Sequence, residues 1–122
     1  MKEKKRKCRK MFGSKEKKIE KFILKGQWDK ISKKYLNADV ETRLLLARQC
    51  EKSKDDEVNN ILSVLIRDVD ERVQIAAIKS MGVTGKDHET AQLQWILSNT
   101  PESKKEVIAA AKEALSMVKG RR

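Results

Sequence analysis

The stretch that decides the fold runs from Asp68 to Gly82 and reads DVDERVQIAAIKSMG. Asp68 and Asp70 form an acidic turn, and Asp70 is well placed to cap the N-terminus of a helix. The apolar residues that follow recur at helical spacing and form one stripe, made of Val73, Ala76, Ala77 and Met81. The adjacent alanines predict a close approach to a neighbouring helix, and Gly82 and Gly85 predict its C-terminal end.

The same pattern recurs on both sides of this stretch. A shift of 31 residues places 25–51 on 56–82, and polar positions then meet polar ones while apolar positions meet apolar ones. Shifts of 31 and then 34 residues carry the second unit onto a third, whose internal turn is three residues longer. A period in the thirties is typical of stacked helix pairs.

Each unit is expected to hold two helices. In the second unit, Asp56 is expected to cap a helix that ends near Arg67. In the third unit, Pro101 is expected at the first position of a helix that carries several alanines. Before the first unit, Ile19, Phe22 and Ile23 lie on one side of a short amphipathic helix, which suits a cap over the end of the stack.

The second helix of the second unit resembles that of a HEAT repeat, in particular the short prokaryotic variety found in bilin-lyase-like repeat proteins. The matching features are the acidic turn, the valine, the paired alanines and the final glycine of 68–82. Gln74 stands where the pattern has arginine, and the first unit keeps that arginine as Arg43. The resemblance covers about 19–119 and implies a solenoid that binds other molecules, with its second helices on the concave face.

We therefore expect an all-α protein, a right-handed α-solenoid of about three HEAT-like helical hairpins with an N-terminal capping helix. The expected organisation is a basic disordered leader at 1–13 and a single repeat domain at 14–120. Within that domain we expect the capping helix at 14–24 and repeats at about 26–54, 55–85 and 86–119. Aromatic residues at 4% of the chain, with five Gly and one Pro, argue against a many-stranded sandwich or barrel.

The net charge of +11 is concentrated at the N-terminus. Residues 1–25 carry +9, residues 26–120 are neutral, and Arg121 and Arg122 supply the rest. Such a segment suits contact with the phosphates of a polyanion, although a solvated tail has the same composition. The candidate polyanion contacts are Lys2, Lys4, Lys5, Arg6, Lys7, Arg9, Lys10, Lys17 and Lys18.

The repeat register predicts a second candidate surface, on the outward side of the second helices. It would form a mildly basic ridge beside an aliphatic position, although ordinary solvated surface would show the same pattern. The ridge residues are Arg43, Arg48, Gln74, Lys79, Ile108 and Lys112.

We expect a non-catalytic scaffold or adaptor that binds a protein partner through the concave face of the second helices. The alternative is a nucleic-acid-associated protein that acts through the basic N-terminal segment. An enzyme is not expected, because His88 is the single histidine and no catalytic relay or Gly-rich phosphate loop can be built. Neither a cofactor nor a metal site is expected, since Cys8, Cys50 and His88 lack the spacing of metal ligands.

Remaining expectations concern single residues and the setting of the chain. Cys50 takes the place of Met81 in the register and should be buried. Trp28 and Trp95 should pack in the core between repeats, with part of the Trp95 ring exposed. No apolar run reaches the length of a membrane-spanning helix, so we expect no integral membrane association. Two cysteines in segments of very different character favour a reducing, cytoplasmic setting, and we expect a monomer.

Overall fold

The protein is all-α over residues 15–120, which are the residues that the computed structural model describes. These residues form seven α-helices and one short 3-10 helix, and no strand occurs among them. The first helix spans residues 15–24 and is called the leading helix below. The others are α2 (Trp28–Lys34), α3 (Val40–Cys50), α4 (Glu57–Leu65), α5 (Glu71–Thr84), η1 (Asp87–Glu89), α6 (Thr90–Asn99) and α7 (Lys105–Gly120).

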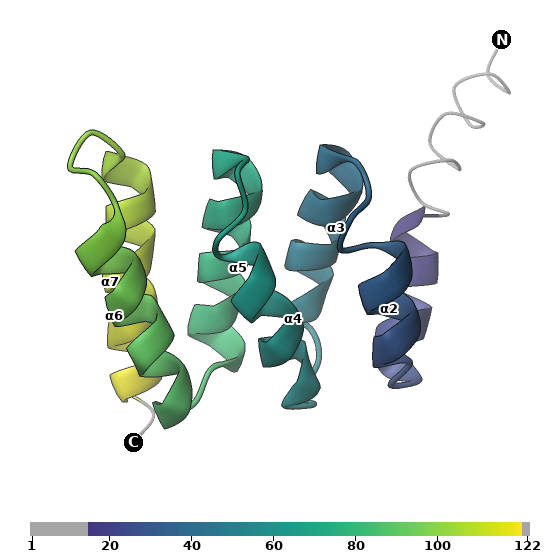
Figure 1. The fold of residues 1–122 in the computed structure, drawn as a ribbon. Coiled ribbons are helices and arrows are strands. Elements are labelled where there is room, and N and C mark those ends of the chain that lie inside the picture. The colour runs from purple at the N-terminus through teal and green to yellow at the C-terminus, as the bar shows by residue number, and fades with distance from the viewer. Residues whose placement is uncertain (1–14, 121–122) are drawn as a thin grey trace, which may run out of the picture.

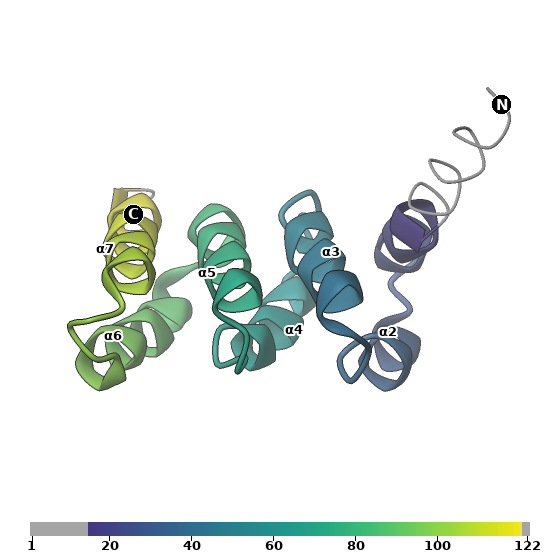
Figure 2. The same ribbon diagram turned by 90° about the horizontal axis from the view of Figure 1, so that it is seen from above.

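The helices lie in two layers that run side by side in chain order. The leading helix, α3, α5 and α7 form one layer, and α2, α4 and α6 form the other (Figure 2). The leading helix and α7 lie at opposite ends of the row (Figure 1). Each layer therefore collects helices that occupy the same place in successive units, and α5 packs against both α3 and α7.

Aspartates set the starts of α4 and α5, but not always the expected ones. The Asp70 carboxylate accepts hydrogen bonds from the backbone N–H groups of Arg72 (2.9 Å) and Val73 (3.4 Å), so the expected cap is confirmed. The expected side-chain cap by Asp56 is wrong, because Asp55 Oδ1 accepts from the N–H of Glu57 at 3.0 Å. Asp56 forms an ion pair with Lys86 instead.

Two helix ends also differ from the sequence-based expectation. Pro101 does not start α7, because residues 102–103 form a turn in which the N–H of Lys104 donates to the Pro101 carbonyl at 3.0 Å. Gly82 does not stop α5, which continues to Thr84 and is followed by Gly85.

The contact between α5 and α7 explains why glycine stands at position 82 inside a helix. A Cβ atom placed there would lie 3.0 Å from the Cα and 3.1 Å from the Cβ of Ala114. Ala77, Ala110 and Ala114 are buried in the same core. Small side chains thus let the two helix backbones approach closely, as the paired alanines predict.

The leading helix covers the free side of α2 and α3. Its apolar side chains Ile19 and Ile23 are buried, and Phe22 packs partly buried against the same core. Glu16 Oε1 accepts a hydrogen bond from Gln49 Nε2 of α3 at 2.9 Å. Apolar burial and this polar contact together fix the helix to the first unit.

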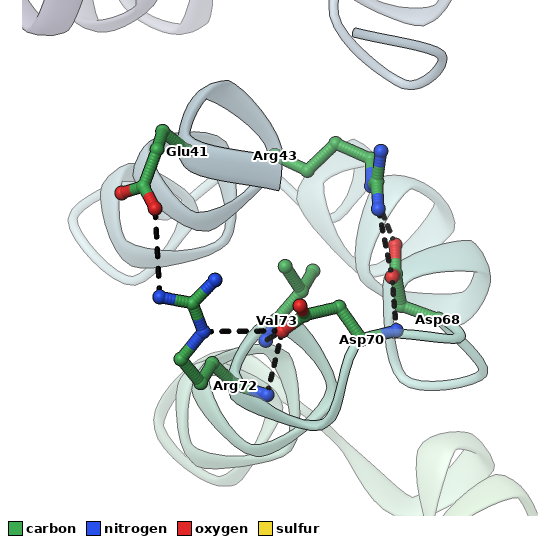
Figure 3. Close-up of polar contacts among 6 residues, drawn as sticks. All are labelled: Glu41, Arg43, Asp68, Asp70, Arg72 and Val73. Atoms are coloured by element: carbon green, nitrogen blue, oxygen red, sulfur yellow. Dashed lines mark hydrogen bonds and ion pairs between the residues drawn. The ribbon is translucent and has the colours of Figure 1, made fainter. Parts of the chain in front are cut away.

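A second kind of contact ties the first unit to the second (Figure 3). The Arg43 guanidinium donates to both carboxylate oxygens of Asp68, at 2.8 and 3.1 Å, and to the Ala38 carbonyl at 2.6 Å. The Arg43 and Asp68 side chains are only 16% and 9% exposed. Arg72 and Glu41 form a weaker neighbouring pair at 3.5 Å, and both are well exposed.

The Gly82 contact predicts a packing-specific loss of stability. Gly82→Val should lower the free energy of unfolding by about 1–3 kcal/mol, because the new side chain would push α5 away from α7. Urea denaturation followed by circular dichroism measures the change. Gly120→Val is the matched control, since a Cβ there meets nothing within 4 Å. Equal losses for the two variants would contradict the close-packed contact.

The Arg43–Asp68 pair predicts a coupled loss. Arg43→Ala should cost about 2 kcal/mol, because Asp68 would keep a largely buried charge without its cation, a cost reduced here by partial exposure. Arg43→Ala combined with Asp68→Ala should cost less than the sum of the single variants in a urea-denaturation cycle. Arg72→Ala, which removes the exposed pair, should cost less than about 1 kcal/mol. Additive losses for Arg43 and Asp68 would refute the coupling.

Candidate functional site

A groove crosses the layer that contains α3, α5 and α7. Its larger hollow has a volume of about 620 Å³ and an apolar floor made by Leu44, Ile75 and Ala76. Charged side chains surround that floor, and they come from the leading helix, α3 and the turn after it, α5 and α7. They are Glu16, Arg48, Glu51, Lys52, Arg72, Lys79 and Glu106.

A second hollow of about 240 Å³ lies between α5 and α7. It shares Glu51 and Lys79 with the first hollow, so the two are continuous. Val83 and Met117 line it and are exposed, although both are apolar. The groove thus offers an apolar surface to solvent on both sides of Lys79.

Local sequence explains why the groove forms on α5. Ile75, Lys79 and Val83 lie four residues apart, so they follow one another along a single face of the helix. Ala76 on the same side is too small to fill the space beside Ile75. The groove therefore forms because Ile75, Ala76 and Val83 leave space on this side of α5 that larger apolar side chains would fill.

The predicted ridge is brought together only in part. Arg48 and Lys79 are exposed, line the groove and form no ion pair with another described residue. Arg43 is not available to a partner, because Asp68 and the Ala38 carbonyl bind its guanidinium. The other predicted ridge residues line neither hollow; they are the half-buried Gln74 and Ile108 and the exposed Lys112.

Sequence reasoning missed the apolar floor, because it assigned Ala76 to the buried stripe of α5 and gave no role to Leu44 or Ile75. Ile75 aligns with Leu44 under the 31-residue shift, and both reach the groove from equivalent positions.

The candidate polyanion contacts divide between described and undescribed parts of the chain. Lys17 and Lys18 lie on the leading helix and are exposed. The remaining seven candidates lie outside the described residues, and they are Lys2, Lys4, Lys5, Arg6, Lys7, Arg9 and Lys10.

Reactive groups in the described part of the chain are few. Cys50 is buried as expected, and burial raises the pKa of its thiol to about 12, which keeps it protonated. No group of three or more His, Cys, Asp or Glu within 15–120 is placed to hold a metal ion. Over the same range, no helix is long and apolar enough to cross a bilayer.

The two tryptophans pack differently. Trp28 is partly buried against the core, as expected. Trp95 is 45% exposed and does not pack against the buried core, so its expected place in the core is wrong, and only the exposure of part of its ring is confirmed. The Arg67 guanidinium lies 4.2 Å from the centre of the Trp95 ring and covers it by a cation–π contact. One face of the Trp95 ring is therefore already covered by the Arg67 side chain.

Glu89 is the only acidic or basic residue of the described range whose side chain is buried. Its side chain is only 1% exposed, at the junction of η1 and α6, and His88 Nε2 lies 2.7 Å from its Oε2. Burial raises the pKa of Glu89 above its ordinary value of 4.5, and the neighbouring His88 opposes this shift. We assign the pair to the packing at the junction of η1 and α6.

No protein family, curated protein or solved structure matches the chain.

The raised pKa of Glu89 predicts a pH-dependent effect on stability. The folded chain holds this proton to higher pH than the unfolded chain does, so its stabilising contribution is present below pH 4.5 and is lost as the pH rises through the folded-state pKa. Glu89→Gln should therefore raise the melting temperature at pH 7 and change it little at pH 4. Thermal unfolding by circular dichroism at both pH values measures this. The exposed Glu102→Gln is the control, and a stabilisation by Glu89→Gln that is no larger at pH 7 than at pH 4 would contradict the burial argument.

Proposed function

We propose that the chain is a non-catalytic binding module that holds an extended polypeptide segment in the groove over α3, α5 and α7. The observation that carries this proposal is the combination of an open apolar floor with the unpaired cations Arg48 and Lys79. The period of the units, the two layers and the alanine-lined contacts support a HEAT-like stack, in which the second helices would form the binding face.

The dimensions of the groove suit a short extended segment. It reaches from Glu16 of the leading helix to Glu106 of α7 and therefore crosses three helix-to-helix spacings. Packed helices lie about 8–10 Å apart, which gives a path of roughly 24–30 Å. An extended chain advances about 3.3 Å per residue, so about eight residues would fill this path.

The lining of the groove sets the chemistry of the segment. Aliphatic side chains would enter the hollows beside Ile75 and beside Val83, where they would lose contact with water. An acidic side chain between them would meet Lys79, which lines both hollows. The groove as a whole carries both signs of charge, so apolar contact supplies affinity and the charges set the register.

Selection from a random twelve-residue peptide library tests this function. Enriched peptides should combine aliphatic residues with at least one acidic residue, and Lys79→Glu should weaken their binding at least tenfold in fluorescence anisotropy. Binding should vary little with salt, because the buried contacts are mainly apolar.

The matched control is Lys119→Glu, which makes the same charge change on α7 outside both hollows. Affinity should stay within twofold of the unmodified protein in this variant. The proposal fails if no peptide is enriched, or if Lys79→Glu and Lys119→Glu weaken binding equally.

A further inference from the structure

The leading helix and α2 together carry a concentration of lysines that the groove does not use. Residues 15–34 hold eight lysines and three acidic residues, a net charge of +5, whereas residues 39–120 carry −2. All eight lysines are exposed. None of them forms an ion pair with another residue of 15–120.

Helical spacing gathers seven of these eight lysines into two stripes. Lys17, Lys18 and Lys21 share one side of the leading helix, and the N–H of Lys25 continues the helical pattern by donating to the Lys21 carbonyl at 3.0 Å. On α2 the second stripe has positions three and four residues apart, which also face one way. It consists of Lys30, Lys33 and Lys34.

Lys34 brings the two stripes together. Its ammonium lies 5.8 Å from the ring centre of Phe22, on the leading helix, and 5.6 Å from that of Tyr35, just after α2. The Phe22 and Tyr35 rings are themselves in contact, with centres 5.9 Å apart. The two lysine stripes thus lie on neighbouring helices that meet at Lys34 and Phe22. These two helices stand at the end of the row of helices (Figure 1).

We propose that this lysine surface of the leading helix and α2 binds the phosphate backbone of double-stranded nucleic acid without reading its sequence. Unpaired ammonium groups are point charges suited to phosphates, and each contact releases condensed counterions. From Lys17 to Lys25 the lysines extend over about 12 Å of helix, a length that matches about seven phosphate charges of a duplex.

The same surface argues against three other partners. Binding in the plane of a membrane needs a free apolar helix face, but Ile19 and Ile23 of the leading helix are buried. Single strands are bound through stacking on open aromatic rings, whereas Phe22 is half-buried with Lys34 beside it. An acidic protein would need an apolar interface core, and Leu24 is the only exposed large apolar residue on these two described helices.

The test compares two variants of the full chain that have the same net charge. The first changes the proposed surface by Lys17→Gln, Lys21→Gln and Lys33→Gln. The second changes three exposed lysines near the other end of the row, by Lys104→Gln, Lys105→Gln and Lys112→Gln. Circular dichroism first establishes that both variants fold. The probe is a fluorescein-labelled 20-base-pair DNA duplex, titrated at 50, 100 and 200 mM salt.

We expect the first variant to bind the duplex at least tenfold more weakly than the unmodified chain at 100 mM salt. Its slope of log affinity against log salt should be shallower by about 2–3, since each lost phosphate contact contributes about 0.9. The second variant should bind within twofold of the unmodified chain. Basic residues 1–10 are present in both variants, so they cancel in the comparison.

Three results would overturn the inference. Equal weakening of the two variants would show attraction by net charge alone. Duplex affinity of the first variant within twofold of the unmodified chain would show that these lysines do not bind phosphate. Tighter binding to phosphatidylserine vesicles or to polyglutamate than to the duplex would assign the surface to a lipid or protein partner. The test does not involve the groove, so its failure would leave the proposed peptide binding standing.

Discussion

Helix α5 contacts both α3 and α7, and the rest of the structure depends on how closely it can approach them. On the α7 side, Gly82 and Ala114 bring the two backbones together. On the α3 side, the buried Ser80 hydroxyl donates to the Ala47 carbonyl at 2.6 Å, which is possible because Ala47 is small. Bulky residues at these positions would separate the units and expose the apolar side chains between the layers. Close approach is therefore the condition for one continuous core.

The two junctions between units are stabilised by different interactions. The first and second units share the Arg43–Asp68 pair, which connects the first turn of α3 to the loop before α5. Between the second and third units, Gln74 and Asn99 occupy the equivalent positions, and α5 and α7 rely on close apolar packing. A buried polar pair fixes the orientation of two units, whereas dense apolar packing supplies most of the free energy that holds two units together. The units thus share a sequence pattern, but different interactions stabilise the two junctions between them.

Periodicity predicts positions within one helix, and it fails where a second helix decides the outcome. The Asp70 cap of α5 follows from local sequence and is confirmed, as are Val73, Ala77 and Met81 of its predicted apolar stripe, whereas Ala76 lies at the groove. The repeat register assigned Arg43 to an outward surface. Its true acceptor, Asp68, is 25 residues away in the chain, so no local pattern identifies it. Pro101 suits both a turn and a helix start, so local chemistry could not choose between them. The floor of the groove was hidden for a related reason, since the exposure of Ile75 depends on how much of it its neighbours cover.

The groove and the lysine surface differ in how their charges are distributed. In the groove, basic and acidic side chains surround an apolar floor, so the net field is weak and contact at short range decides which segment fits. On the leading helix and α2, the lysines form no ion pair with a described acidic residue. Their attraction for a polyanion therefore extends over about a Debye length and weakens as salt is added. A partner that carried both an extended apolar segment and a polyanion could contact both surfaces at once, because α3 adjoins the leading helix (Figure 2). The short distance between the surfaces would then make the second contact effectively intramolecular.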